Sequence, residues 1–325
     1  MGGIPSYDSA MTPGVAFVFP GQGSQAVGMG QEFYDFEPEA RALFEQAGQV
    51  LGYNVATLCF KGPAEQLNLT EYTQPALLTA SVVAFRLLER AGLRPSTVAG
   101  HSLGEYTAVV AAGGLAFPDA VALVRKRGRY MQDAVEAGRG LVCAILGLER
   151  TVVAEVCRSA SALGVVAPAN FNAPGQIVIA GEKAAVEEAA RQAKAKGCRK
   201  VIPLPVSVPV HTSLMQAAAA RLAVDVDRVP MQDLTVLLIN NAEAKPIRTA
   251  ADVRTSLVRQ LSRPVLWEES VQALVKMGIH TLVEVGPGRV LSGLAKRITP
   301  ELRLFNVQDR TSLAATVEAL AAARP

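Results

Sequence analysis

The sequence is poor in cysteine and histidine. Its four cysteines, Cys59, Cys143, Cys157 and Cys198, lie far apart in the chain and form no C-x-x-C pair. Their spacing argues against a disulfide framework or a zinc site and is typical of buried thiols in a reducing compartment. Only three histidines are available as a catalytic base. Because H-E-x-x-H, P-loop and EF-hand spacings are also missing, we expect no metal and no cofactor.

Long apolar runs and an excess of one charge are missing too. No apolar run reaches the ~18 residues that a membrane-spanning helix needs. Lys and Arg number 32 against 29 Asp and Glu, so nothing indicates a nucleic-acid partner. Arg41 is the first basic residue, which leaves no charged region for a secretory signal. We therefore expect a cytoplasmic protein without a membrane partner, and a monomer because no heptad pattern occurs.

The first residues carry one targeting pattern. Met1–Ser6 fits the N-myristoylation motif M-G-x-x-x-[ST]. We interpret this segment instead as an upstream start before Met11.

The order of apolar and amphipathic segments indicates an α/β fold. With 325 residues, half of them hydrophobic, the chain can form one large domain with a smaller insert. Strand-like runs alternate with helical patterns, which is typical of a parallel sheet flanked by helices. The expected elements are strands at Val15–Phe19, Ser96–Ala99, Leu234–Asn240 and Thr281–Val285, with helices at Glu37–Leu51, Pro75–Ala91 and Leu103–Ala112.

The pattern changes between residues 134 and 206. The predicted order there is strand 140–148, helix 150–162, strands 165–170 and 176–180, helix 182–196 and strand 199–204. This β-α-β-β-α-β order is that of a ferredoxin-like unit. We therefore predict an α/β-hydrolase-like large domain formed by residues 1–133 and 207–325, with an inserted ferredoxin-like small domain at 134–206.

The pentapeptide Gly100-His101-Ser102-Leu103-Gly104 matches G-x-S-x-G, between a predicted strand and a predicted helix. Glycines on both sides of a serine permit a sharp turn that exposes the hydroxyl at a helix N-terminus. Unpaired N–H groups there favour developing negative charge. Ser102 is therefore a candidate nucleophile, and the structural alternative is a helix N-cap serine beside packing glycines.

A serine nucleophile needs a base that takes its proton. His101 is adjacent to Ser102 on the turn, so its side chain is expected to point elsewhere. His211 ends a proline-rich extended segment directly before a predicted helix, where functional loops are common, and is our candidate base. His280, just before a strand, is interpreted as structural.

Two other segments bear on a substrate site. Gly21–Ala26 formally satisfies the dinucleotide-binding pattern G-x-G-x-x-[GA]. A dinucleotide site also requires a second strand that ends in Asp or Glu about 20 residues later, but here the helical pattern of Glu37–Leu51 occupies that region. We expect instead a turn whose amides form an oxyanion hole with the amide after Ser102. In the basic segment Arg125–Tyr130, one inward-facing arginine is a candidate for binding a substrate carboxylate.

Together these motifs resemble the malonyl-CoA:acyl carrier protein transacylases, the loading enzymes of bacterial type II fatty acid synthesis. The resemblance runs from Val15 to Asn306. It is carried by F-P-G-Q-G-S-Q at 19–25, Q-P-A at 74–76, G-H-S-L-G-E-Y at 100–106, R-G at 127–128, N-F-N-A-P-G-Q at 170–176, N-N at 240–241 and E-V-G-P-G at 284–288.

The resemblance implies a role for each matching residue, with malonyl-CoA and phosphopantetheinylated acyl carrier protein as substrates. Ser102 becomes malonylated, His211 acts as base and later as acid, the backbone amides of Gln22 and Leu103 form the oxyanion hole, Arg127 pairs with the malonyl carboxylate, and Gln260 orients His211 through its backbone carbonyl. Val210 departs from the Ser or Phe common in relatives and borders the acyl pocket, which leaves strict malonyl selectivity open. The acidic carrier protein is expected to dock partly on the basic cluster Arg125–Arg129.

Two other classes remain as alternatives. An α/β-hydrolase esterase or thioesterase shares the serine turn and would recruit His280 with Asp252. A non-enzymatic scaffold protein would form no acyl-serine at all.

Overall fold

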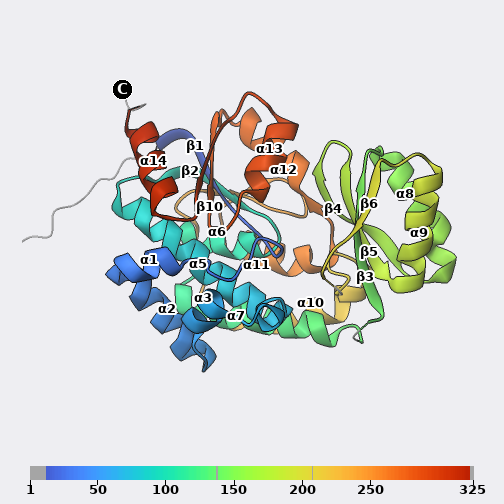
Figure 1. The fold of residues 1–325 in the computed structure, drawn as a ribbon, viewed down its shortest axis with the longest axis horizontal. Helices are drawn as coiled ribbons and strands as arrows, with labels where there is room; N and C mark the ends of the chain where they lie inside the picture. The colour runs from blue at the N-terminus through green and yellow to red at the C-terminus, as the bar shows by residue number, and fades with distance from the viewer. Residues whose placement is uncertain (1–11, 137, 207, 323–325) are drawn as a thin grey trace, which may run out of the picture.

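The computed structural model describes residues 12–136, 138–206 and 208–322. The myristoylation pattern at residues 1–6 lies outside the described residues. Figure 1 shows two lobes, a larger one that contains both ends of the described chain and a smaller one built around strands β3 to β6.

The larger lobe is organised around a six-stranded sheet with the order β11-β10-β1-β2-β7-β8. All neighbouring strands are parallel except β7 and β8, which are antiparallel. The strands are β1 (Thr12–Phe19), β2 (Pro95–Gly100), β7 (Leu237–Ile239), β8 (Pro246–Ile247), β10 (Thr281–Val285) and β11 (Arg303–Val307).

The central strand β1 is buried on both faces, as its continuous apolar run requires. Val15, Phe17 and Phe19 join the core formed with the helices on one side of the sheet, including α2, α5 and α7. Ala16 and Val18 point to the other side, toward α12 and α13. Alternate side chains of one strand therefore bind the two helical layers to the sheet.

The helices of the larger lobe connect these strands. They are α1 (Gln31–Phe36), α2 (Pro38–Leu51), α3 (Val55–Lys61), α4 (Ala64–Leu67), α5 (Thr70–Arg90), α6 (Leu103–Ala111), α7 (Phe117–Asp133), α10 (Gln216–Arg228), α11 (Ala250–Arg259), α12 (Trp267–Lys276), α13 (Val290–Ile298) and α14 (Arg310–Ala321), with short 3-10 turns at Ser213–Met215 and Gln260–Ser262.

The smaller lobe contains a second sheet with the order β6-β3-β5-β4-β9. Its fifth strand, β9, comes from a later part of the chain and pairs in parallel with β4, an addition that the sequence analysis did not anticipate. The elements are β3 (Gly140–Leu146), α8 (Arg150–Ala160), a 3-10 turn at Ser161–Leu163, β4 (Val166–Ala173), β5 (Gln176–Glu182), α9 (Lys183–Ala195), β6 (Lys200–Pro203) and β9 (Val265–Leu266).

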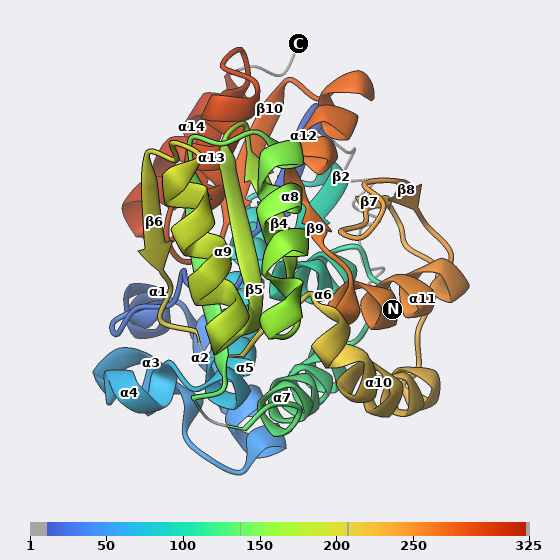
Figure 2. The same ribbon diagram turned by 90° about the vertical axis from the view of Figure 1, so that its right-hand side faces the viewer.

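The two faces of the second sheet have different surroundings. Helices α8 and α9 cover one face, as Figure 2 shows, and pack on Ile145, Ile177 and Ile179. The opposite face carries Val142 and Val178, which line a cavity shared with the larger lobe. The small sheet therefore forms one wall of that cavity.

The mixed α/β fold with a parallel sheet is confirmed, and the cysteines are free thiols, most of them buried. One predicted helix boundary is wrong, because α5 begins at Thr70 and not at Pro75. The Thr73 hydroxyl donates to the carbonyls of Leu67 (2.6 Å) and Leu69 (3.0 Å), which holds an additional helical turn before the proline.

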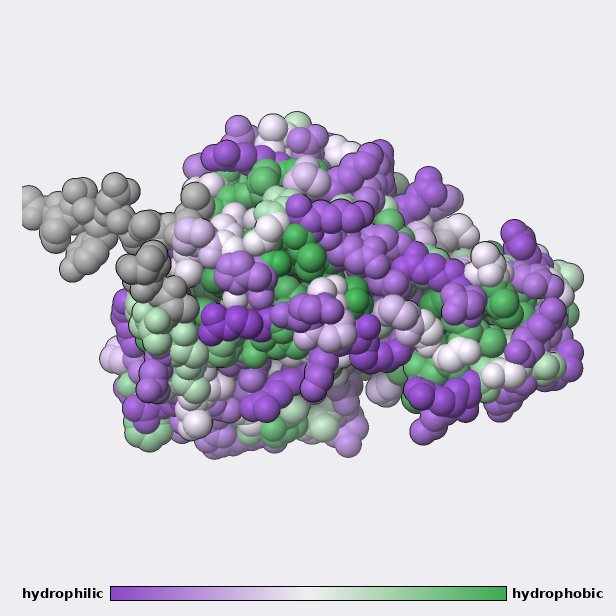
Figure 3. Space-filling view, turned by 90° about the horizontal axis from the view of Figure 1, so that it is seen from above, coloured by the Kyte–Doolittle hydropathy of each residue, from purple (hydrophilic) through white to green (hydrophobic). Residues whose placement is uncertain are grey.

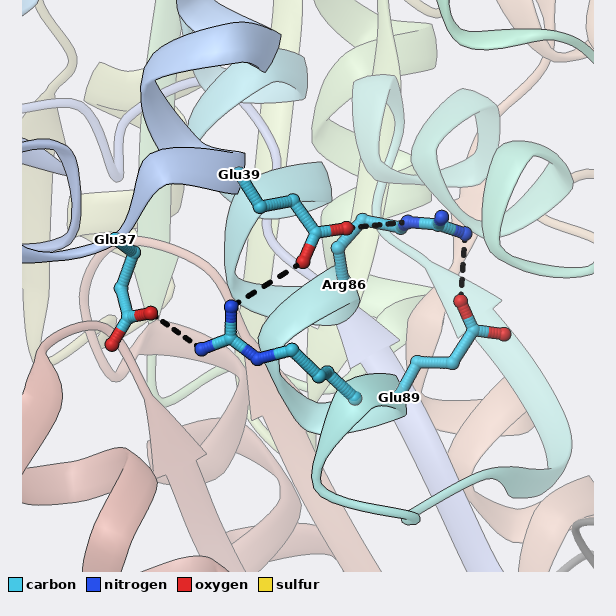
Figure 4. A network of polar contacts seen from close by, with 5 residues as sticks. Glu37, Glu39, Arg86 and Glu89 are labelled. Carbon is cyan, nitrogen blue, oxygen red and sulfur yellow. Dashed lines mark hydrogen bonds and ion pairs between the residues drawn. The ribbon is translucent and has the colours of Figure 1, made fainter.

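An ion-pair cluster joins the start of α2 to the end of α5 (Figure 4). Arg86 pairs with Glu39 at 3.3 Å and with Glu89 at 2.7 Å, and Arg90 pairs with Glu37. Because the Arg86 side chain is 49% exposed, each of its pairs contributes at most about 1 kcal/mol to stability.

The surface of both lobes carries many hydrophilic side chains in the view of Figure 3. Among the described residues, none of the helices has both the length and the apolar character needed to cross a bilayer.

Replacing Gly104 by alanine is expected to destabilise the fold. A Cβ atom on Gly104 in α6 would lie 2.0 Å from the carbonyl oxygen of Phe19. Overpacking against backbone atoms should lower the free energy of unfolding by about 3 kcal/mol.

Gly293→Ala in α13 is the matched control, because no atom lies within 4 Å of its added Cβ. This change should raise stability by about 0.5–1 kcal/mol. Equal effects in denaturant titrations would contradict this packing account.

Candidate active site

Ser102 occupies a strained turn between β2 and α6. Its backbone has φ 51° and ψ −105°, outside the regions that side chains ordinarily allow. The turn is close-packed, since a Cβ on Gly100 would lie 2.0 Å from the carbonyl group of Gly104. Glycines therefore flank the serine because strand and helix approach too closely for any side chain. The serine lies at the N-terminus of α6, as its sequence motif predicts.

The amide side chain of Asn241 holds this turn in place. Its Oδ1 accepts a hydrogen bond from the Ser102 N–H at 2.6 Å, and its Nδ2 donates to the Gly100 carbonyl at 2.6 Å. Asn241 follows β7, the neighbour of β2 in the sheet. In the sequence, only the N-N pair at 240–241 points to Asn241, and no role follows from it.

His211 contacts the Ser102 hydroxyl. Its Nε2 lies 2.8 Å from Ser102 Oγ, and its Nδ1 lies 2.6 Å from the backbone carbonyl oxygen of Gln260. A carbonyl only accepts hydrogen bonds, so Nδ1 carries the proton and Nε2 is free to accept the hydroxyl proton. Burial, with the nearby Arg127 cation, lowers the pKa of His211 to about 3. The imidazole is therefore neutral, as a base requires.

Arg127 brings a buried cation to the same place. The residue is 1% exposed. Its Nη1 donates to Gln74 Oε1 at 2.8 Å, and its Nη2 donates to Gln260 Oε1 at 2.9 Å and to Ser102 Oγ at 3.1 Å. Its Nε has no partner within the described part of the chain, and none of the ion pairs found there involves Arg127. Burial lowers the pKa of the guanidinium.

The Gln22 loop comes close to the serine turn. A Cβ on Gly21 would lie 2.4 Å from the His101 carbonyl oxygen, so glycine permits this approach. The Gln22 side chain is anchored by a 3.2 Å hydrogen bond to Thr70 Oγ1. Over the described residues, the backbone N–H groups of Gln22 and Leu103 find no acceptor, and both residues line the cavity. Both amides are therefore available to a negatively charged oxygen.

The cavity has a volume of about 80 Å³ and lies between the two lobes. One part of its wall is polar and contains Ser102, His211 and Arg127. The remaining wall is mostly apolar and includes Met131, Val142, Val178, Leu204, Val206 and Val210. Its size and lining suit a small acyl group that carries a negative charge.

The other two histidines lie apart from this chemistry. His101 is half-buried, its Nε2 lies 2.8 Å from Asn172 Oδ1, and its ring makes a T-shaped contact with Trp267. His280 is exposed at the amino end of β10, whereas Ser102 follows the carboxyl end of β2. Asp252 pairs with Thr249 at the start of α11. The structure therefore does not assemble the hydrolase set of Ser102, His280 and Asp252.

The basic cluster expected to help carrier docking is divided by the helical geometry of α7. Arg125 contacts the Leu51 carbonyl and the ring of Tyr53, and Arg127 faces the cavity. Lys126 and Arg129 are exposed, and they pair with Asp225 (2.6 Å) and Glu71 (4.0 Å) respectively. The cluster is therefore not one continuous basic surface.

Two buried side chains for which the sequence predicts no role, Gln74 and Glu105, support the site. Gln74 accepts a hydrogen bond from Arg127. Glu105, one turn beyond Ser102 in α6, is completely buried, and burial raises the pKa of its carboxyl group to about 7. Neither residue type is distinctive in a sequence, and the only signal was membership in the Q-P-A and G-H-S-L-G-E-Y blocks.

The chain matches known proteins over nearly its whole length. Residues 16–305 match the family model described as the acyl transferase domain. The chain is 47% identical over 304 residues to the malonyl CoA-acyl carrier protein transacylase of Escherichia coli K12, which covers 93% of this chain and 98% of the relative. It is 44% identical over 307 residues to the Bacillus subtilis 168 protein of the same name, covering 94% and 97%.

Solved structures agree with these similarities. The malonyl-CoA:acyl carrier protein transacylase from Xanthomonas oryzae superposes with a TM-score of 0.93 at 46% identity, covering 95% of this chain and 99% of that one. A malonyl-transacylase solved in complex with its type II PKS acyl-carrier protein superposes with a TM-score of 0.92 at 44% identity, covering 94% and 99%.

The low pKa of His211 predicts a specific acid sensitivity. The folded protein keeps this imidazole neutral down to about pH 3, whereas the unfolded chain binds a proton below about pH 6.5. Acid therefore favours unfolding in this window. Between pH 6.5 and pH 5, wild type should lose about 1.5 kcal/mol more unfolding free energy than His211→Gln. Denaturant titrations at both pH values measure this difference, because the other titrating groups are common to both proteins. Equal losses of unfolding free energy in the two proteins would mean that folding does not lower the pKa of His211.

Proposed function

Since the chain belongs to the malonyl CoA-acyl carrier protein transacylase family, we propose that Ser102 carries the malonyl group between the two substrates. The enzyme moves this group from malonyl-CoA to acyl carrier protein, as the loading step of type II fatty acid synthesis. The observation that carries the assignment of Ser102 is its hydroxyl at 2.8 Å from Nε2 of a neutral, buried His211.

In the first half-reaction, Ser102 Oγ attacks the thioester carbonyl of malonyl-CoA while His211 Nε2 takes the hydroxyl proton. The negative charge that develops on the carbonyl oxygen is stabilised by the backbone amides of Gln22 and Leu103. The C–S bond then breaks, and the imidazolium returns the proton to the departing coenzyme A sulfur. The product is a malonyl-serine ester.

In the second half-reaction, His211 takes the proton of the phosphopantetheine thiol of acyl carrier protein. The thiolate attacks the ester carbonyl, and the Ser102 oxygen leaves as its proton returns from the imidazolium. The Gln260 carbonyl stabilises the transient positive charge by accepting from Nδ1–H, in the place where other enzymes use a carboxylate. Serine, histidine, one thioester substrate and one thiol substrate balance the reaction, so no cofactor is needed.

Arg127 accounts for selection of a carboxylated acyl group. Its cation is held by neutral amide oxygens and lacks an ion-pair partner in the described residues. The malonyl carboxylate supplies the missing charge and can accept two parallel hydrogen bonds. An acetyl group would leave the guanidinium unpaired, at a cost of roughly 2–4 kcal/mol, or about 30- to 1000-fold in selectivity.

The partner and the domain division complete the proposal. A relative solved with an acyl-carrier protein supports the same partner for this chain.

We assign residues 134–206 to an inserted ferredoxin-like domain and residues 1–133 and 207–325 to the α/β-hydrolase-like domain. The strand order β6-β3-β5-β4 supports this division. Free thiols favour the cytoplasm as the location.

Intact-protein mass spectrometry tests the reaction. After mixing with malonyl-CoA, the protein should gain one malonyl group, which acyl carrier protein then removes and retains. Ser102→Ala should gain none. Release of the malonyl group to water and not to the carrier would instead identify a thioesterase, and an unmodified wild type would contradict the proposal.

Arg127→Ala should lower malonyl transfer and narrow the difference from acetyl transfer. The rate of acylation of Ser102 by malonyl-CoA should fall about 30-fold or more, while acylation by acetyl-CoA changes less. Arg125→Ala is the matched control on α7, since its guanidinium contacts Leu51 and not the cavity. Unchanged malonyl preference in Arg127→Ala would remove the carboxylate-binding role.

A further inference from the structure

Glu105 is a completely buried acidic residue that the reaction above does not use. Its Oε1 accepts a 2.6 Å hydrogen bond from Ser256 Oγ. Its Oε2 accepts from the backbone N–H of Asn241 and from Gln260 Nε2, both at 3.1 Å. Three neutral donors therefore meet at one carboxyl group behind the cavity, one from the segment after β7 and two from α11 and the 3-10 turn that follows it.

The contact with Gln260 determines which way its side-chain amide faces. Gln260 Nε2 donates to Glu105 Oε2 and to the Ser102 carbonyl oxygen at 3.0 Å. Both of these are acceptors, so the NH2 end of the amide must point toward them. The other end, Oε1, consequently faces Arg127 and accepts from its Nη2 at 2.9 Å. A reversed amide would bring its NH2 group against the guanidinium, and both are donors.

The second contact of Oε2 connects Glu105 to the nucleophile. Asn241 donates its backbone N–H to the carboxyl group, and its side chain accepts from the Ser102 N–H. Glu105 itself lies in α6, whose first residue follows Ser102. One carboxyl group thus accepts hydrogen bonds from Asn241, which supports the serine turn, and from Gln260, which supports the guanidinium.

We propose that Glu105 is a positioning residue for acyl-group selection: by accepting from Gln260 Nε2, its carboxyl group holds the Gln260 amide in the orientation that aims Arg127 at the substrate carboxylate. This inference rests on the proposed malonyl transfer. It assigns to Glu105 an effect on the choice between acyl groups, in addition to support for the fold.

Two substitutions separate the hydrogen-bond role of Glu105 from the role of its charge. Glu105→Gln retains one acceptor oxygen for Asn241 and Gln260, and its NH2 group can donate to the Ser256 hydroxyl, which also accepts. Glu105→Met has a similar volume but no comparable acceptor. Ser256→Ala is the matched control, because it removes a hydrogen bond from the same carboxyl group without touching Gln260.

The experiment measures acylation of Ser102 in full-length protein with malonyl-CoA and with acetyl-CoA, by intact mass against time. Glu105→Met should reduce the malonyl-to-acetyl ratio of kcat/KM by about tenfold or more. This is the effect of losing one hydrogen bond made by a charged group, here the bond from the Arg127 guanidinium to Gln260 Oε1. Glu105→Gln should restore the ratio to within about threefold of wild type, and Ser256→Ala should leave it unchanged. A purely structural role would lower both rates together and leave the ratio intact.

The outcomes separate this inference from the proposed function. If wild type forms no malonyl-serine, the proposed function fails and the inference with it. If wild type reacts but Glu105→Met keeps the wild-type ratio, only the positioning role is overturned. A ratio in Glu105→Gln as low as that in Glu105→Met would also overturn it, because the charge and not the acceptor would then be responsible.

Discussion

The burial of the Arg127 guanidinium beside Ser102 and His211 is the interaction on which the site depends. Neutral amide oxygens of Gln74 and Gln260 accept hydrogen bonds from its two Nη atoms but do not neutralise its charge. The same cation contributes to the low pKa of His211, which keeps the imidazole neutral. In this account one buried charge both prepares the base and selects a substrate with a carboxylate. On the proposed function, the cost of burying this cation is offset when that carboxylate binds.

The fold makes this arrangement possible by bringing distant loops together at one edge of a parallel sheet. The loops after β1, β2 and β7 supply Gln22, Ser102 and Asn241, and these strands are neighbours in the sheet. Close approach requires glycine both in the loop after β1, at Gly21, and in α6, at Gly104, where an added Cβ would meet backbone atoms. The sheet of the smaller lobe closes the cavity from the other side and gives it an apolar wall.

The sequence predicted the local features better than the distant contacts. The glycine spacing around Ser102 predicted a turn before a helix, and α6 does begin at Leu103. For Arg127, by contrast, only the family resemblance predicted a role. The sequence of the basic segment does not show which of its arginines faces inward. Asn241 and Glu105 were left without roles, because Asn241 contacts Ser102 across 139 residues and no periodicity encodes such contacts. Strand β9 was missed because two residues give no pattern.

The central claim is that an unpaired buried cation recognises the acyl carboxylate. Its most direct test is the affinity of the non-reacting Ser102→Ala protein for malonyl-CoA and for acetyl-CoA, measured by isothermal titration calorimetry. The account predicts that malonyl-CoA binds at least about 30-fold more tightly. Equal affinities for the two thioesters would show that Arg127 does not pair with the carboxylate in the bound state and would contradict the account.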